Sequence, residues 1–274
     1  MRFLSCAAVA ASACFFALTL AHPVPAEARK RDDQADREAT KYFHEPGGDD
    51  ILGHYDIRYF KGVVSYDERI DTIQHMTRAY LDWFREEGLE TWIAHGTLLG
   101  WWWSGTMLPW DWDVDTQVAG STLAYMAKHH NRTIVKYDPH NGTRKRQYLL
   151  DVNPWQWERV KGDGMNIIDA RWIDTHNGLY IDITGLSETE PDTNPGVLSC
   201  KNNHKYSTSD LFPMRRSTYE GVPALIPYAY DKMLIEEYQA KSLTETEYEG
   251  HKWDPALNKW VKMPEKEEEG KETA

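Results

Sequence analysis

The sequence predicts an α+β protein, with a single domain in which a mixed β-sheet is flanked by helices. Three observations support this fold class. A capped amphipathic helix is predicted after residue 65, strand and helix patterns alternate beyond it, and two alternating runs flank Asn177-Gly178 as in a hairpin. Hydrophobic residues make up 41% of the chain, which is enough to form a core.

The first predicted helix begins after Ser65, which forms a capping box with Glu68, and it ends at Gly88. Its inward face follows from residues spaced three and four apart: Ile70, Ile73, Thr77, Tyr80 and Phe84. The elements predicted next, in order, are a short strand over 90–96, a short helix with its first turn at Thr97, a strand over 113–119, a helix over 121–130 capped by Ser121, and a strand over 146–152.

The dipeptide Asn177-Gly178 is a strong hairpin signal because both residues tolerate a positive φ angle. A two-residue turn there places Ile173 opposite Asp182 and Arg171 opposite Thr184. Arg171 and Asp182 then share one face of the hairpin as diagonal neighbours, about 7–8 Å apart at the backbone.

Residues 1–21 are predicted to be a signal peptide, because Arg2 precedes an uncharged apolar run that ends in small residues. The alternative is an uncleaved membrane anchor through residues 3–21. Both interpretations send the chain into the secretory pathway, to the Golgi lumen or for secretion. Asn131 and Asn141 head Asn-x-Thr triplets and are candidate glycosylation sites there.

The remaining boundaries follow from composition. Residues 22–55 are polar and are predicted to be a linker or pro-segment, and residues 56–263 are predicted to form the domain. Residues 264–274 carry five Glu and two Lys and are predicted to be an acidic disordered tail.

The formal net charge of −12 argues against nucleic acid as a partner, because nonspecific binding to nucleic acid needs a basic surface. An anionic ligand would need local Arg or Lys residues, or metal ions, to offset the acidity. Cys200 is the one cysteine outside the predicted signal segment, so a cysteine-ligated zinc cluster is excluded.

The stretch Ala94–Val118 combines five tryptophans with Asp111, Asp113 and Asp115. In a strand, Asp113 and Asp115 point the same way, about 6.6–7 Å apart at the backbone, and can converge on divalent cations. Ligands that are all oxygen suit Mg²⁺ or Mn²⁺. A solvated strand edge is the alternative interpretation, but the surrounding tryptophans make it less favourable.

A strand, a Gly96-Thr97 turn, a helix and an Asp-x-Asp strand together form the plan of a nucleotidyltransferase-like site. The glycine lets a ligand approach the backbone, and the helix N-terminus favours a phosphate. Such a site needs a third carboxylate on a neighbouring strand, and Asp182 in "YIDIT" is the candidate. Arg171 and Arg215 are candidate phosphate-binding residues, so the substrate-binding set is Gly96, Thr97, Arg171 and Arg215.

The segments "HGTLLGWWWSGTMLPWDWDVD" and "DLFPMRRSTYEGVPALIPYAYDKMLIEEY" resemble the LicD family, which includes fukutin-related proteins and fungal mannosylphosphate-transfer proteins. "DARWIDTHNGLYIDITGL" is similar to the fungal branch, and the resemblance covers roughly residues 60–240. Fukutin-related proteins use a cysteine-ligated zinc element that this chain lacks, which also favours the fungal branch.

The resemblance implies a nucleotidyltransferase-like fold and a metal-dependent phosphotransferase. In the fungal branch, the implied reaction moves mannose 1-phosphate from GDP-mannose onto a glycan. It also implies that Asp113, Asp115 and Asp182 hold the metal and that Asp111 is an acidic neighbour, which we interpret as a candidate general base. Two alternatives remain open: a noncatalytic partner or regulator of a transferase, and a GT-A-type glycosyltransferase.

Overall fold

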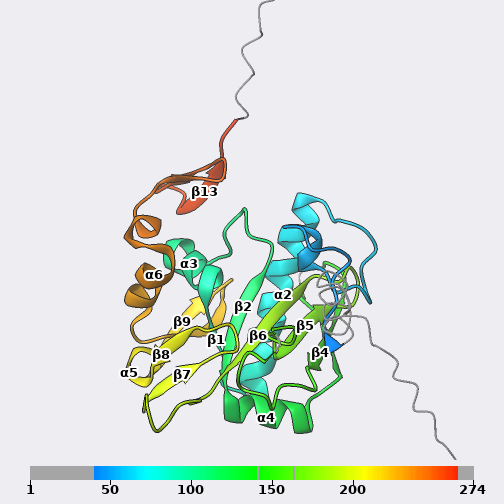
Figure 1. Ribbon diagram of the computed structural model, residues 1–274. Coiled ribbons are helices and arrows are strands. Elements are labelled where there is room, and N and C mark those ends of the chain that lie inside the picture. Colours follow the sequence, from blue (N-terminus) through cyan, green and yellow to red (C-terminus); the bar gives the residue numbers. More distant parts are fainter. Residues whose placement is uncertain (1–39, 141, 163, 265–274) are drawn as a thin grey trace, which may run out of the picture. The chain divides into compact units, whose positions relative to one another are not determined.

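A six-stranded mixed sheet forms the centre of the computed structural model, which describes residues 40–140, 142–162 and 164–264 (Figure 1). Its strands are β1 (Trp92–Ile93), β2 (Val114–Ala119), β3 (Thr133–Tyr137), β4 (Arg146–Val152), β5 (Ala170–Asp174) and β6 (Tyr180–Leu186). They lie in the order β1-β2-β6-β5-β4-β3. The β2–β6 pair is parallel and the other pairs are antiparallel, so the sheet is mixed and the predicted α+β class is confirmed.

The other elements surround this sheet. The helices are α2 (Tyr66–Glu86), α3 (His95–Ser104), α4 (Gly120–His129), α5 (Thr208–Leu211) and α6 (Tyr230–Tyr238), with 3-10 helices η1 (Leu52–His54) and η2 (Ala240–Leu243). Three smaller sheets comprise β7 (Val197–Ser199) with β8 (Lys205–Ser207), β9 (Arg215–Tyr219) with β10 (Val222–Ile226), and β11 (Glu247–Tyr248) with β12 (His251–Asp254) and β13 (Lys259–Lys262).

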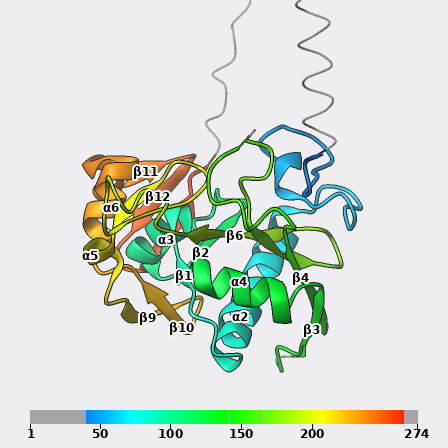
Figure 2. The ribbon, with the colours of Figure 1, turned by 60° about the horizontal axis from the view of Figure 1, so that its bottom comes forward.

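Helices α2 and α4 pack against the same face of the central sheet (Figure 2). Trp172 of β5 contacts Tyr80 of α2, with ring centroids 5.8 Å apart, and a Cβ added to Gly185 of β6 would meet Leu123 of α4. Trp172 and Gly185 share this face because paired residues in neighbouring strands point the same way. The side chain of Asp182, which is next to Ile183 along β6, therefore lies on the opposite face.

Helix α2 forms as predicted. The Ser65 hydroxyl accepts a hydrogen bond from the Glu68 backbone N–H at 3.2 Å, and Gly88 has a φ angle of +71° just beyond the helix. The predicted inward residues Ile73, Tyr80 and Phe84 are buried in the main core. The helix is therefore stabilised by its capping residue and by the burial of one face.

The hairpin between β5 and β6 exists, but its predicted two-residue turn is wrong. Arg171 lies directly opposite Asp182, not diagonal to it, and five residues, Thr175–Leu179, separate the two strands. The Gly178 N–H donates to the Asp174 carbonyl at 2.9 Å, while its own carbonyl accepts from the Asp56 N–H at 2.8 Å. Contacts with this distant segment hold the wider loop, so the register differs by two residues from that of a minimal turn.

Two helix starts also differ from the sequence predictions. Helix α3 begins at His95, two residues before Thr97, and helix α4 begins at Gly120 with Ala119 as a cap that makes no side-chain hydrogen bond. Ser121 is therefore inside the helix and is not its cap. The chain leaves β2 beside Leu186 and Ser187, and position 120 has no room for a side chain there. A Cβ would lie 2.3 Å from the Ser187 hydroxyl, so this position requires glycine.

The predicted linker over residues 22–55 is wrong in its final part. Phe43 and Tyr55 are buried, with exposed fractions of 4% and 0%, and the unit that contains the sheet begins at Thr40. The predicted signal or anchor at residues 1–21, the linker up to residue 39 and the tail over 265–274 lie outside the described residues. Among the described residues, no helix is both long enough and apolar enough to cross a bilayer.

Candidate functional site

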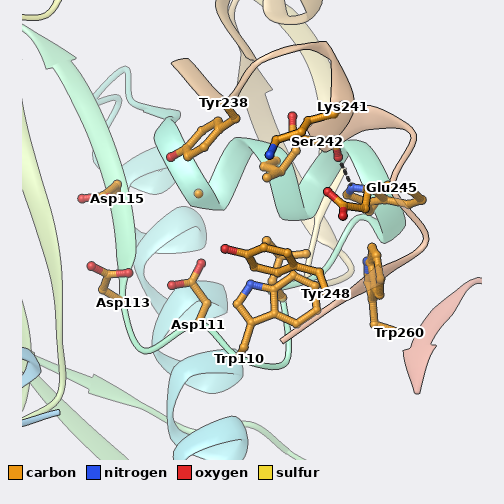
Figure 3. A pocket seen from close by; sticks show the side chains of 14 residues that line it. Trp110, Asp111, Asp113, Asp115, Tyr238, Lys241, Ser242, Glu245, Tyr248 and Trp260 are labelled. Atoms are coloured by element: carbon orange, nitrogen blue, oxygen red, sulfur yellow. Dashed lines mark hydrogen bonds between the residues drawn. The ribbon is translucent and has the colours of Figure 1, made fainter. Parts of the chain in front are cut away.

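Asp111, Asp113 and Asp115 line one cavity of about 440 Å³ (Figure 3). Asp111 and Asp113 precede β2 and Asp115 lies within it, so a single short segment presents all three carboxylates. Figure 3 shows their side chains along one side of the cavity. We call this cavity the aspartate pocket.

The loop that carries the aspartates is held by Arg69, a buried residue of α2. Its guanidinium donates to the Asp111 carbonyl and, at 2.6 Å, to the Pro109 carbonyl. It also lies 4.4 Å from the centre of the Trp112 ring. The sequence analysis did not single out Arg69, although an arginine within the hydrophobic face of an amphipathic helix was the available signal.

Gly96 and Thr97 both lie in the first turn of α3, but they have different tasks. The Thr97 hydroxyl is buried and accepts a hydrogen bond from the Asp115 backbone N–H at 2.9 Å, so it positions the strand. Gly96 lines the aspartate pocket, where an added Cβ would lie 3.0 Å from the Asp111 carboxylate. The absence of a side chain at Gly96 therefore keeps the space beside Asp111 open.

Asp182 lies beside Asp115, because these two residues are partners in the parallel β2–β6 pair. Neighbouring strands are about 4.8 Å apart, which brings the third carboxylate within reach of the other aspartates. Asp182 also accepts a hydrogen bond from the Arg171 Nε at 2.8 Å. It lines a second cavity of about 380 Å³, together with Arg171, Glu45 and several glycines.

The carboxylates influence one another strongly. Burial, followed by the charge of Asp113, raises the pKa of Asp111 to about 8. Burial and the charges of Asp113, Asp182 and Glu237 raise the pKa of Asp115 well above its ordinary value. Burial also raises the pKa of Asp182, although Arg171 acts in the opposite direction. The cluster thus carries more negative charge than its protein surroundings neutralise.

In metal-free protein, we expect the free energy of unfolding to decrease as the pH rises from about 4 to about 8. The folded state keeps a proton on Asp111, whose pKa is about 8, while the unfolded chain loses it near 3.8. The folded state therefore binds more protons across this window, and stability falls with pH. Urea unfolding in EDTA at pH 5 and pH 8 would measure this change.

The matched variants for this measurement are Asp111→Asn and Asp192→Asn. Asn at position 111 cannot ionise, so we expect a smaller decrease in stability and a more stable protein at pH 8. Asp192 is exposed, and its variant should behave like the wild type. An identical pH dependence in Asp111→Asn and the wild type would contradict the assignment.

The two arginines predicted to bind phosphate do not line the aspartate pocket. Arg171 is buried between Asp182 and Glu45, whose carboxylates lie 2.8 Å and 2.6 Å from the guanidinium. Arg215 is exposed on β9, where it donates to the Tyr228 carbonyl at 2.8 Å. The sequence did not reveal that Arg171 forms ion pairs with two carboxylates. It also did not reveal that Arg215, on β9, lies outside the aspartate pocket.

The candidate glycosylation sites are partly described. Asn131 is exposed in the turn before β3, and its side-chain oxygen accepts a hydrogen bond from the Val152 N–H at 2.9 Å. Its side-chain nitrogen, to which a glycan would attach, makes no hydrogen bond with the described residues. Asn141 lies outside the described residues.

A second cluster lies beside the aspartates: His95, His204 and Glu237 have potential ligand atoms within 4.8 Å of one another. The Trp92 indole N–H donates to the Gln117 oxygen at 3.0 Å, so the Gln117 amide nitrogen faces His95 Nε2 at 3.3 Å. His95 Nε2 must then accept, and His95 Nδ1 donates to Glu237 at 2.6 Å. The cluster is a hydrogen-bonded chain that positions the start of α3.

The part of the aspartate pocket that comes from the chain beyond residue 237 was not predicted from the sequence, which pointed only to the tryptophans and leucines near the aspartates. The residues that line the pocket besides Gly96 and the aspartates come from α3, the loop before β2, the last residue of α6 and the chain that follows: Leu99, Trp103, Leu108, Trp110, Tyr238, Lys241, Ser242, Glu245, Tyr248 and Trp260. Six of these residues lie after position 237, and in the sequence only the clustering of aromatic residues around the aspartates pointed to such a wall.

The chain is similar to one family of known proteins and to two yeast proteins. A family model described as "LicD/FKTN/FKRP, nucleotidyltransferase domain" matches residues 88–229, which include β2, β6 and all four aspartates. Mannosyltransferase regulator 4 of Saccharomyces cerevisiae is 34% identical over 156 residues, 54% of this chain and 13% of that protein. Mannosyltransferase regulator 14 of the same yeast is 39% identical over 115 residues, 42% of this chain and 12% of that protein. The matched segments thus span a small part of these relatives.

Proposed function

The chain belongs to the LicD family of nucleotidyltransferase domains, and from this premise we propose that it is a metal-dependent phosphotransferase acting on glycans of the secretory pathway. The proposed donor is GDP-mannose, from which mannose 1-phosphate moves to a glycan hydroxyl. The observation that carries the proposal is the convergence of Asp111, Asp113 and Asp115 on one pocket, with Asp182 on the adjacent parallel strand. A structural role alone does not require four carboxylates in such close proximity.

The residues fit a divalent cation. Buried carboxylates that raise one another's pKa values need a compensating positive charge, and their ligand atoms are all oxygen. Asp113, Asp115 and Asp182 would hold Mg²⁺ or Mn²⁺. When bound, the cation would offset the charge of the donor phosphates.

The remaining residues have roles in binding and orientation. Arg69 and Thr97 hold the backbone of Asp111 and Asp115, and Gly96 leaves room beside Asp111. In the proposed reaction, the acceptor oxygen bonds to the phosphorus that carries mannose, and the bond from this phosphorus to the GMP oxygen breaks. Asp111 accepts the hydroxyl proton, a task for which a carboxyl group with a raised pKa is suited.

A second candidate function is regulation of a separate mannosylphosphate transferase, for which this chain would be a noncatalytic partner. The names of both yeast relatives support it, since each is called a mannosyltransferase regulator. A GT-A-type glycosyltransferase is less favoured, because that fold places a nucleotide-binding doubly wound sheet before the Asp-x-Asp motif. Here the parallel pair β2–β6 is the central feature.

The nucleotide product separates these functions. We expect the purified protein, given GDP-mannose, Mn²⁺ and an oligomannose acceptor, to release GMP and form a mannose phosphodiester. Phosphotransfer breaks the bond between the two phosphates, whereas glycosyl transfer breaks the sugar–oxygen bond and releases GDP. Chromatography of the nucleotides with and without EDTA would measure the products. GDP alone would support glycosyl transfer, and Mn²⁺-dependent donor binding without release of nucleotide would support the regulator.

A further inference from the structure

A nucleotide-sugar donor carries negative phosphates into a pocket that already contains three aspartates. A cation of the protein would have to contact these phosphates in addition to any metal ion. Arg171 is already paired with Asp182 and Glu45, and Arg215 stacks on Tyr228 outside the pocket. In these positions, neither arginine lines the aspartate pocket, so neither can contact a donor bound there.

Among the described residues, Lys241 of η2 is the only lysine or arginine whose side chain lines the aspartate pocket. Figure 3 shows it extending from the η2 backbone towards the space beside the aspartates. No carboxylate of the described residues lies within 4.0 Å of its ammonium group. Lys232 and Lys252 of the same part of the chain, by contrast, contact Asp210 at 2.7 Å and Glu247 at 2.8 Å. Lys241 therefore has its charge available for a ligand.

Aromatic rings line the pocket from Asp111 outwards: Trp110 and Tyr248 lie beside Asp111, and Trp260 lies farther from the aspartates (Figure 3). The ring centroid of Trp110 lies 5.2 Å from that of Tyr248 and 5.0 Å from that of Trp260, and both contacts are edge-to-face. The Trp103 indole N–H donates to the Ser242 carbonyl at 3.0 Å, which ties η2 to α3. The rings thus form a fixed apolar wall, as Figure 3 shows for Trp110, Tyr248 and Trp260.

We propose that residues 230–262 complete the donor site: Lys241 binds a phosphate of the nucleotide, and the aromatic wall stacks on its base. The inference rests on the proposed function, because it assumes a nucleotide donor at the aspartates. A planar base suits an aromatic wall, since every base has a π-face. The segment lies beyond residues 88–229, which match the family model, so the shared domain alone would not bind the nucleotide fully.

The second cavity, at Asp182, offers a place for the acceptor glycan if the nucleotide binds on the aromatic side of the aspartate pocket. It is lined by Asp182, Glu45, Arg171 and glycines such as Gly47, and it shares none of the lining residues of the aspartate pocket. If the nucleotide occupies the aromatic side, the acceptor glycan can approach the transferred phosphate from the side of Asp182. The leaving GMP and the attacking hydroxyl then lie on opposite sides of the phosphate, as in-line transfer requires.

Calorimetric titration with GDP in the presence of Mn²⁺ tests the inference without any need for turnover. We expect Lys241→Met and Tyr248→Ala each to weaken GDP binding at least about tenfold, as loss of one stacking ring does at other nucleotide sites. Lys241→Arg should retain most of the affinity. Lys259→Met is the matched control, because Lys259 is exposed on β13 and does not line the pocket.

Unchanged GDP affinity in both Lys241→Met and Tyr248→Ala would overturn the inference, and so would wild-type protein that binds no GDP with Mn²⁺. A titration with mannobiose tests the alternative occupant. Loss of mannobiose binding in Tyr248→Ala, with GDP binding intact, would make the aromatic wall an acceptor site and refute our assignment. Wild-type GDP binding that depends on Lys241, without any release of GMP, would support the inference while refuting the catalytic proposal.

Discussion

Replacing Asp115 by Asn is expected to abolish GMP release and to weaken Mn²⁺ binding about 100-fold or more. Loss of a residue that only supports a metal ligand typically costs about 10–100-fold, and loss of a ligand itself should cost more. Asn has nearly the same shape, and the backbone N–H of residue 115 can still donate to Thr97. The substitution removes a carboxyl group whose ionisation is unfavourable beside Asp113 and Asp182, so the fold should be retained and the metal-free protein stabilised. Titration with Mn²⁺ and the nucleotide assay would measure the two effects.

Asp113→Asn should behave like Asp115→Asn, because both carboxylates line the same pocket. The matched control is again Asp192→Asn, an exposed carboxylate far along the chain, which should leave metal affinity and activity unchanged. Mn²⁺ affinity equal to that of the wild type in both pocket variants would refute the metal assignment. Normal Mn²⁺ binding with loss of GMP release would instead show that these aspartates act in the transfer reaction and not in metal binding.

Asp169→Ala is expected to lower the free energy of unfolding by about 3–5 kcal/mol, the cost of removing one partner from a buried ion pair. Asp169 is fully buried, accepts from the Gly185 N–H at 2.8 Å and contacts Arg159 at 2.8 Å and Lys201 at 3.0 Å. Lys201 is itself only 2% exposed, so the variant would leave its charge buried without a counterion. Thermal unfolding would show a Tm lower by roughly 10 °C.

Asp210→Ala is the control for this stability measurement. Asp210 also contacts a lysine, Lys232 at 2.7 Å, but that lysine is half exposed, so loss of the pair should change stability little. Asp169→Asn retains an acceptor for the Gly185 N–H and should fall between the wild type and Asp169→Ala. A change of less than about 1 kcal/mol in Asp169→Ala would show that water reaches Lys201 and Arg159.

The stability of this network also bears on the site. Asp169 fixes Gly185 of β6, three residues beyond Asp182, and a Cβ at position 185 would lie 2.6 Å from Leu123 of α4. The position of Asp182 beside Asp115 thus depends on an ion pair that the proposed chemistry does not use. If Asp169→Asn binds Mn²⁺ with normal affinity but has weak activity at saturating Mn²⁺, the ion pair has this indirect role.

The sequence by itself determined the elements whose signals are local. Ser65 and Glu68 define the start of α2, and the spacing of Ile73, Tyr80 and Phe84 defines its buried face, because capping and amphipathicity act within a few turns of one helix. The alternation around Asp115 likewise predicted β2, which begins at Val114, one residue after the predicted start at Asp113. These features need no knowledge of distant segments.

Only the tertiary structure decided which residues meet across long sequence distances. The hairpin register depends on Asp56 bonding to Gly178, and the pairing of Arg171 with Glu45 depends on the chain between residues 40 and 55 packing against β6. Lys241 and Tyr248 reach the aspartates because Trp103 holds η2 against α3. Such contacts join residues more than 100 positions apart, and no periodicity or local propensity records them. The sequence therefore determined the carboxylates, and the tertiary structure determined which cation and which aromatic rings face them.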